Sequence, residues 1–337
     1  MAMTIRYPVL MSAALLAAPA ASADALSLRL PLACEIGRTC FIQHYVDRDP
    51  GSGARDYTCG SRTYDGHDGI DIRLSSRPAA AGPAGAVLAA APGRVLRTRG
   101  DAADVSVRET GRDAVAGVEC GNGAVIAHAD GYETQYCHLA KGSLTVRPGD
   151  TVAAGQAIGQ VGLSGASEFP HLHFTLRRNG RMLDPFAPTA PAEACLPAGA
   201  LPPDNLWDAS VQPALAYRAG AVLNAGFSGG PVGMAEVETE ATGSVEPASG
   251  ALVAWIRTIG LDTGDAQRLV LQGPDGRVLA ENADKPLARP RAQTLIFAGK
   301  KRPAAGWGPG TYTATYTVWR AGSVALQHSF STTLAAR

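Results

Sequence analysis

The sequence has little charge of either sign. Asp, Glu, Lys and Arg make up only 18% of the 337 residues, and the formal net charge is 0. A chain without excess positive charge has no electrostatic basis for binding nucleic acid or an anionic membrane surface. The sequence therefore predicts neither as the principal partner.

Long apolar runs are also absent after the first residues. Arg6 is followed by an apolar stretch that includes Leu15-Leu16 and by small residues that end at Ala23. This pattern is typical of a signal peptide and is too short for a transmembrane helix; the alternative is an N-terminal membrane anchor. We predict that residues 1–23 are a signal peptide, that the chain is periplasmic or secreted, and that it does not insert into a membrane after cleavage.

Six cysteines follow this segment, and an even number in an exported chain predicts disulfide bonds. The spacing leaves their connectivity open. The cysteines are Cys34, Cys40, Cys59, Cys120, Cys137 and Cys195.

No convincing amphipathic helix is present in the first half of the chain, where apolar residues instead follow the alternation of β-strands. We expect two of these strands to form a hairpin around Ala129-Asp130-Gly131. This half is predicted to be a mainly antiparallel β domain, residues 24–186. The expected strands cover Ile70–Leu74, Ala124–His128, Tyr132–Leu139, Leu144–Val146, Ala157–Leu163, His171–Leu176 and Arg181–Leu183.

Composition shifts to Ala and Pro after the first domain, which predicts a semi-rigid linker over residues 187–204. Because Cys195 lies inside it, we expect the linker to be cross-linked. Residues 205–337 are predicted to form an immunoglobulin-like β-sandwich, whose role the sequence does not indicate. Its expected strands are Leu252–Ile256, Arg268–Gln272, Thr294–Ala298, Tyr312–Trp319 and Val324–Phe330.

Two short motifs carry metal-binding side chains, His67-Asp68-Gly69-Ile70-Asp71 and His171-Leu172-His173. The alternation of a strand places both imidazoles of the second motif on one face. Two imidazoles and a carboxylate with an open fourth position are typical of a catalytic zinc site. We predict that His67, Asp71 and His173 bind one Zn²⁺ per chain, and that His171 contacts the water or the developing oxyanion.

The remaining histidines are less informative by pattern alone. His138 is a lone strand histidine, for which a buried structural role is the simpler interpretation. Alternation predicts that Tyr136 and His138 share one face, so that Cys137 faces away and forms a disulfide. A structural or surface role is favoured for His128, and His44 is left unassigned.

A set of motifs, in this order, resembles the LytM/lysostaphin-type metallopeptidases, peptidase family M23. The resemblance covers roughly Tyr64 to Pro185, and its strength lies in the ordered set, because a single His-x-His occurs by chance. The segments are His67–Asp71, Gly121–His128, Gly131–Leu139, Val146–Val152, Gly162–Gly165 and Pro170–Phe174.

The resemblance implies a groove-bearing antiparallel β-structure that cuts peptide cross-links of bacterial peptidoglycan. By resemblance, zinc is held by His67, Asp71 and His173, while His138 and His171 assist catalysis. All five positions are kept, which argues against the inactive relatives that only activate other wall hydrolases. No His-Glu-x-x-His motif supplies an acidic base, so a histidine takes that role.

The chain also departs from the family pattern. A polar stretch from Arg99 to Gly117 is expected to be an insertion at the groove edge. Cys120 and Cys137 are unusual for the family and are predicted to pair. The segment Cys34–Cys59 has no counterpart, and one hypothesis is that it partly covers the groove and makes the enzyme latent.

The leading hypothesis is therefore an exported zinc endopeptidase acting on peptidoglycan. One alternative is a non-catalytic wall-binding or regulatory protein that uses the same groove. A second is a lipoyl- or biotin-carrier domain, suggested by Val146–Val152, but no lysine lies at the required hairpin tip. The sequence indicates neither the bond that is cut nor any protein partner.

Overall fold

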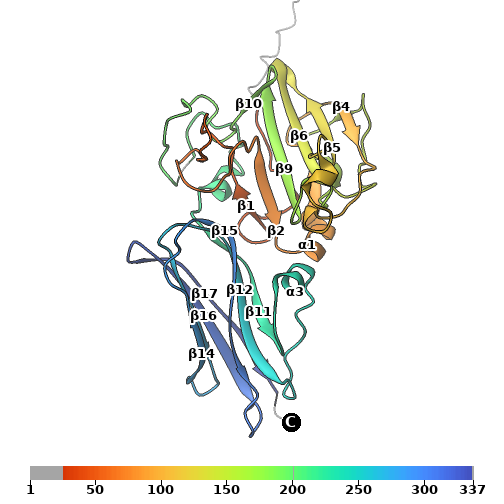
Figure 1. The fold of residues 1–337 in the computed structure, drawn as a ribbon. Helices are drawn as coiled ribbons and strands as arrows, with labels where there is room; N and C mark the ends of the chain where they lie inside the picture. The colour runs from red at the N-terminus through yellow and green to blue at the C-terminus, as the bar shows by residue number, and fades with distance from the viewer. Residues whose placement is uncertain (1–25, 200, 336–337) are drawn as a thin grey trace, which may run out of the picture.

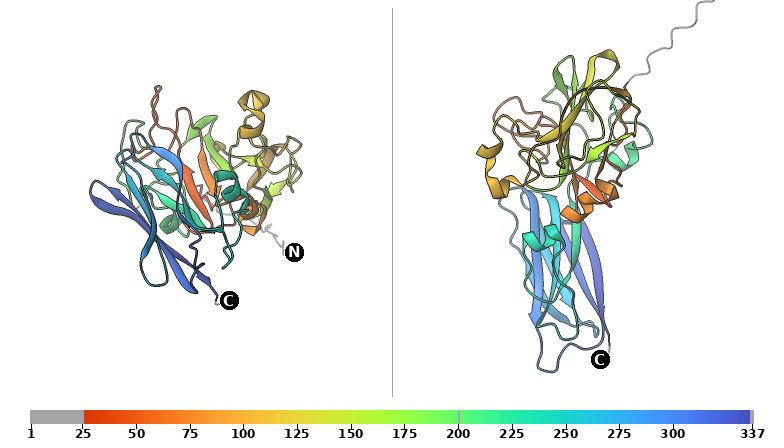
Figure 2. Two further views of the ribbon diagram at one scale, coloured as in Figure 1. Left: turned by 60° about the horizontal axis from the view of Figure 1, so that its bottom comes forward. Right: turned by 90° about the vertical axis from the view of Figure 1, so that its right-hand side faces the viewer.

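The structure is a computed structural model that describes residues 26–199 and 201–335; the predicted signal peptide, residues 1–23, lies outside the described residues. Figure 1 shows two β-rich parts placed end to end, and Figure 2 shows the same arrangement from two other sides. Within the described residues, no helix has the length and apolar character needed to cross a membrane. The predicted fold class, mainly antiparallel β, is confirmed.

The first part is built on an eight-stranded sheet in which every neighbouring pair of strands is antiparallel. A small second sheet pairs β3 (Ala86–Leu88) with β8 (Ala157–Gln160). The main sheet has the order β1 (Cys40–His44), β2 (Ile70–Leu74), β9 (His171–Arg178), β6 (Tyr132–Leu139), β5 (Asn122–Ala127), β4 (Gly93–Arg99) and β7 (Thr151–Val152), with β10 (Arg181–Leu183) also paired to β9.

The core of this part lies on one face of the main sheet. Alternate residues of β9, such as Leu172 and Phe174, are buried there, while His171 and His173 occupy the other face. This division is the one that strand alternation predicts. The sheet therefore presents a polar face on which a site can be built.

The expected hairpin and most of the expected strands are confirmed, but the strand predicted over Leu144–Val146 is wrong. Thr145 N bonds to Ile158 O, yet the segment forms no ladder. Val146 is nevertheless buried in the core, so its apolar character reflects packing of an irregular segment. The strand predicted over Ala157–Leu163 also ends early, at Gln160.

Helices in the described residues are short, the longest having six residues. Ser76 caps the first one by accepting a hydrogen bond from the backbone of Ala79. The α-helices are α1 (Arg77–Ala81), α2 (Val107–Thr110) and α3 (Met234–Thr239), and the 3₁₀ turns are η1 (Pro83–Gly85), η2 (Arg112–Val115), η3 (Ala129–Gly131) and η4 (Gln212–Leu215).

The second part is a sandwich of two antiparallel sheets, with Leu252, Leu269 and Tyr316 fully buried between them. One sheet has the order β11 (Ala221–Ser228), β12 (Ala251–Leu261) and β15 (Arg291–Lys301). The other has the order β14 (Val278–Ala283), β13 (Ala266–Gln272), β16 (Gly310–Arg320) and β17 (Ser323–Leu334).

Two strands of the sandwich, β11 and β14, were not predicted. The pairing of β11 is interrupted by a register shift between Val222 and Asn224, and β14 is a largely exposed edge strand. β14 is the fourth strand of the sandwich along the chain, and it pairs with β13 in the second sheet. In the constant-type immunoglobulin fold the fourth strand belongs to the first sheet instead. The predicted sandwich is otherwise present.

The stretch predicted to be a linker lies against the first part. Cys59 is disulfide-bonded to Cys195, as the expected cross-link requires. Further along the chain, Trp207 and Leu215 are buried in the core of the first part. The domain boundaries proposed at 186/187 and 204/205 stay a prediction.

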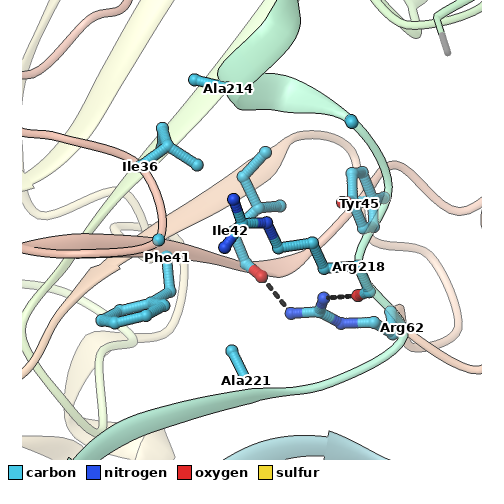
Figure 3. A pocket seen from close by; sticks show the side chains of 10 residues that line it. Ile36, Phe41, Ile42, Tyr45, Arg62, Ala214, Arg218 and Ala221 are labelled. Atoms are coloured by element: carbon cyan, nitrogen blue, oxygen red, sulfur yellow. Dashed lines mark hydrogen bonds between the residues drawn. The ribbon is translucent and has the colours of Figure 1, made fainter. Parts of the chain in front are cut away.

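The two parts are in contact over a partly apolar junction. Phe41 of β1 packs with Leu223 and Ile259 of the sandwich. Figure 3 shows the guanidinium of Arg62 donating to the carbonyl oxygens of Ile42 and of Arg218, a residue of the segment that leads into β11. The junction therefore joins the sandwich directly to β1 of the main sheet.

Candidate metal centre

The strand register brings the predicted ligands together. Asp71 on β2 lies directly opposite His173 on β9, and on the other side of β2 it lies opposite His44 on β1. Cross-strand neighbours project from the same face of a sheet. His67 approaches the same point from the loop that precedes β2, four residues before Asp71.

Three ligand atoms converge at this point. His67 Nε2 lies 3.2 Å from Asp71 Oδ1 and 3.2 Å from His173 Nδ1, and the last two atoms are 3.0 Å apart. Tetrahedral zinc with bonds of about 2.0–2.1 Å needs ligand atoms separated by roughly 3.3 Å. The residues present therefore fit zinc, both in donor type and in spacing.

The second nitrogen of each ligand histidine has its own partner. His67 Nδ1 donates to the backbone oxygen of Tyr45 at 2.6 Å. His173 Nε2 lies 3.1 Å from the Asp68 carboxylate and donates to it. These hydrogen bonds leave His67 Nε2 and His173 Nδ1 for a metal, and such outer contacts fix the ring orientation of metal ligands.

The Asp71 carboxylate is held as well. Its Oδ2 accepts a hydrogen bond from His44 Nδ1 at 2.9 Å, so that Oδ1 faces the two ligand nitrogens. Burial alone would raise the pKa of Asp71, but the surrounding histidines hold it well below its ordinary value. The carboxylate is thus ionised, as a metal ligand must be.

His173 has an unusual protonation state in the absence of a metal. Burial lowers its pKa, but the carboxylates of Asp68 and Asp71 outweigh burial and raise the pKa to about 9. A cation is therefore already stabilised between these two carboxylates. Metal binding at Nδ1 has to displace a proton from that atom.

His171 and His138 lie beside this group, with their ring centres 4.7 Å apart. His171 Nδ1 donates to the Phe169 carbonyl and His138 Nδ1 to the Ser164 carbonyl, each at 2.8 Å. Each ring therefore presents an unprotonated Nε2 to the site, and His171 Nε2 lies 3.4 Å from Asp71 Oδ1.

Burial decides the protonation of these two histidines. It lowers the pKa of His171 to about 4 and lowers that of His138 well below its ordinary value. Both are neutral near pH 7, which suits a group that accepts a proton from water.

The predicted orientation of the β6 side chains is wrong. Tyr136 lies in the core, whereas Cys137 is the cross-strand neighbour of His173 and faces the site. His138 also reaches the site because its φ is +65°, a left-handed conformation that breaks the alternation of the strand. Such a backbone is costly for a residue other than glycine and is concentrated at functional sites.

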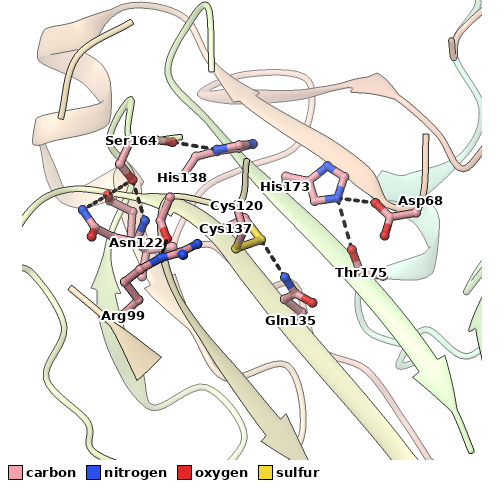
Figure 4. The surroundings of a disulfide bond; sticks show 12 residues. Asp68, Arg99, Cys120, Asn122, Gln135, Cys137, His138, Ser164, His173 and Thr175 are labelled. Carbon is pink, nitrogen blue, oxygen red and sulfur yellow. Dashed lines mark hydrogen bonds and ion pairs between the residues drawn. A yellow bond between two sulfur atoms is a disulfide. The ribbon is translucent and has the colours of Figure 1, made fainter. Parts of the chain in front are cut away.

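The predicted Cys120–Cys137 disulfide is present and lies next to the metal centre. Figure 4 shows it beside His138 and His173, with Gln135 bonded to the Cys137 sulfur. Cys137 faces the site but is held in this bond, so its sulfur does not compete for a metal. All six cysteines of the chain are paired, the third bond being Cys34–Cys40.

Gly69 is required by the closeness of the loop to β9. A Cβ at this position would lie 2.6 Å from His173 Nε2 and 2.7 Å from the Phe174 oxygen. The glycine in the first motif therefore allows the His67 loop to pack directly on the ligand strand.

Two pockets open beside the histidines, one on the His171 side and one on the His173 side. The predicted insertion lies at their edge, because Arg108 of α2 lines the first pocket and Arg112 of η2 lines both. The segment Cys34–Cys59 forms a wall of the first pocket through Gln43 and His44. It does not close either pocket, and latency stays a hypothesis.

Sequence reasoning missed three neighbours of the predicted ligands. His44 was seen but unassigned, because its partner Asp71 is distant in sequence and the pairing includes a bulge. Asp68 lies inside the first motif, but its contact with His173 was not predicted. Tyr64 lines both pockets, and its ring centre lies 4.4 Å from that of His67.

The remaining histidines lie away from this group. His128 bonds to the Pro92 carbonyl and to Thr134 Oγ1, in line with the structural role favoured for it. His328 lies on β17 of the sandwich and stacks on Phe330.

Comparison with known proteins places this domain among peptidases. Residues 65–185 match the sequence profile of peptidase family M23. The DD-carboxypeptidase/endopeptidase Mpg of Neisseria meningitidis serogroup B is 41% identical over 71 residues, which are 21% of this chain and 16% of the relative. The peptidoglycan DD-endopeptidase ShyA of Vibrio cholerae is 38% identical over 77 residues, 23% of this chain and 17% of the relative.

Among solved structures, the catalytic domain of lysostaphin from Staphylococcus simulans aligns with 24% identity and a TM-score of 0.27, covering 42% of this chain and 89% of that domain. The chain spans about a sixth of the length of the curated relatives named above. The family match covers the segment that carries all five predicted site residues. Residues 65–185 of this chain therefore belong to peptidase family M23, the family that its ordered motifs predict.

Proposed function

We propose that this protein is an exported zinc endopeptidase that hydrolyses peptide cross-links of bacterial peptidoglycan. Residues 24–186 would carry the activity. The two curated relatives described above are named as an endopeptidase and a peptidoglycan endopeptidase. Export agrees with three disulfide bonds, which persist in oxidising compartments.

The observation that carries the proposal is the convergence of His67 Nε2, Asp71 Oδ1 and His173 Nδ1 within 3.2 Å of one another. Three protein ligands leave a position for water or substrate, as in catalytic rather than structural zinc sites. A purely wall-binding protein has no need for two further neutral imidazoles at the same point.

When bound, zinc would polarise the scissile carbonyl and increase the acidity of the attacking water. His171 Nε2 takes up the proton that the water loses, since the Phe169 carbonyl keeps the proton of this ring on Nδ1. His138 Nε2 lies on the same side and, once protonated, donates to the developing oxyanion or the leaving amine. Burial of both rings excludes water that would compete for these hydrogen bonds.

The test uses purified peptidoglycan, the zinc-loaded full chain and a chelator-treated sample. We expect soluble fragments with new peptide ends, identified by mass spectrometry, and none after chelation. His328→Ala is the matched control, because this histidine lies on the sandwich, and it should keep full activity. If the zinc-loaded protein binds the wall but releases no fragments, a wall-binding or regulatory role replaces the enzyme.

A further inference from the structure

The pocket on the His171 side is formed by both parts of the molecule. Asp71, His138 and His171 line it from the peptidase domain, and Ala292 and Gln293 line it from the sandwich. We propose that the sandwich completes the substrate site, with Gln293 accepting a hydrogen bond from the backbone of the bound peptide. This inference rests on the proposed function, because it assigns part of the same groove.

A buried ion network fixes the sandwich at this position. Arg73 of β2 is 1% exposed, and its Nη2 lies 3.1 Å from Glu238 Oε2 of helix α3. Arg257 of β12, also fully buried, pairs with the same carboxylate and donates to the Ser75 oxygen of the peptidase domain. Removing Glu238 would leave two buried cations unpaired, so this contact holds the two parts in one arrangement.

Only the side chain of Phe169 separates this ion network from His171. Arg73 is the cross-strand neighbour of His171. Its guanidinium carbon lies 4.1 Å from the centre of the Phe169 ring, and that ring lies 4.7 Å from the ring of His171. Because β12 carries Arg257 and pairs with β15, the network also holds β15 in place on this side of the molecule.

Gln293, which lines this pocket, has an unused hydrogen-bonding atom. It is the third residue of β15; its Nε2 lies 3.1 Å from Met234 Sδ, and its buried Oε1 has no hydrogen-bond partner. A buried acceptor without a donor is costly, and most such atoms find a partner in the protein, in water or in a ligand.

A peptide substrate supplies the missing donor. A peptide lying extended through the pocket exposes a backbone N–H at every second residue to each side. One of these can donate to Gln293 Oε1 while the scissile bond lies beside His171. The recognised ligand is thus an extended peptide segment, bound through its main chain.

The test compares Gln293→Ala with Gln327→Ala in the full chain. Gln327 is the same residue type, exposed on β17 of the same sandwich and away from the pocket. With purified cross-linked muropeptide dimers as substrate, losing one neutral hydrogen bond should raise KM about three- to tenfold. kcat should stay close to the wild-type value, because the contact is made equally in the ground and transition states. Gln327→Ala should match the wild type in both constants.

A second variant, Gln293→Trp, fills the pocket and should lower kcat/KM more than Gln293→Ala does, with unchanged zinc content and melting temperature. Equal kcat/KM in all these proteins would overturn the inference while leaving the proposed function intact. If the wild type cleaves nothing, the proposed function fails instead. Calorimetric binding of the same dimers then decides the inference: weaker binding by Gln293→Ala supports it, and equal binding overturns it.

Discussion

His171 and His173 lie two residues apart on β9, but they differ in what surrounds them. His173 lies between the carboxylates of Asp68 and Asp71, which raise its pKa to about 9. His171 Nδ1 donates to the Phe169 carbonyl and lies 3.3 Å from Ser167 Oγ, and burial outweighs the charge of Asp71 and lowers the pKa of His171 to about 4. One residue type thus has two protonation states on a single strand, two residues apart.

Under the proposed function, this difference lets one strand supply both a metal ligand, His173, and a base, His171. A site that stabilises positive charge beside a carboxylate suits a metal ion, whereas a desolvated neutral imidazole suits proton transfer. The following changes should break or sharpen that contrast, and they are ordered from the largest expected effect to the smallest.

Removing a metal ligand should abolish zinc binding and peptidoglycan cleavage together. In His173→Ala, the remaining two ligands bind zinc poorly, so we expect zinc content near zero and no wall cleavage. Elemental analysis of the purified protein and a cleavage assay on the same sample check this. Retention of one zinc per chain would remove His173 from the ligand set.

Removing a proton-transfer group should lower the rate of cleavage but leave zinc binding intact. We expect His138→Ala to keep its zinc and to lose about 10²–10⁴-fold in kcat, the usual contribution of general acid–base catalysis. Metal analysis and single-turnover rates, with His328→Ala as the comparison, measure both. Full activity in His138→Ala would exclude this residue from the mechanism.

Weakening an outer contact should lower metal affinity without removing the site. Asp68→Asn keeps the shape of the side chain but removes the charge that His173 Nε2 faces. We expect zinc affinity to fall by about 10- to 100-fold in competition with a chromogenic chelator. Asp275→Asn, in an exposed turn of the sandwich, is the control, and equal affinities for both variants would contradict the assigned contact.

A smaller effect concerns stability, at a buried acid outside the site. Burial raises the pKa of Asp184 to about 7, while Phe186 N donates to its Oδ1. The folded state thus holds a proton that the unfolded state releases, so the free energy of unfolding should fall as the pH rises from about 4 to about 7.

The variant Asp184→Asn has no carboxyl group at this position, so it has no proton to lose as the pH rises. Relative to the wild type, it should gain stability between pH 5 and pH 8, by at most roughly 1.4 kcal/mol for each unit of pKa difference. Urea unfolding of both proteins at the two pH values measures it. Parallel changes in the two proteins would show that Asp184 does not titrate in this range.

Much of the site could be predicted because its residues sit in local motifs. His171 and His173 share a face by simple alternation, and Gly69 marks the loop that brings His67 near Asp71. What alternation could not predict is His138, whose positive φ turns its side chain out of the strand pattern. The role of His44 depends on a bulged pairing between β1 and β2, which has no local signature.

The fold was predictable where strands alternate clearly and failed where packing overrides the pattern. Val146 is buried although it lies outside any strand, whereas β14 is a strand whose residues are largely exposed. The junction of the two parts was invisible in the sequence. Arg73, Glu238 and Arg257 come from distant segments, and nothing in their spacing indicates that they form one buried ion network.

The most direct test of the account is anomalous X-ray scattering at the zinc absorption edge, from crystals of the zinc-loaded protein. We predict one peak, about 2.0–2.1 Å from each of His67 Nε2, Asp71 Oδ1 and His173 Nδ1, in every chain. A peak at other residues, or no peak between these three atoms in protein that carries stoichiometric zinc, would contradict it.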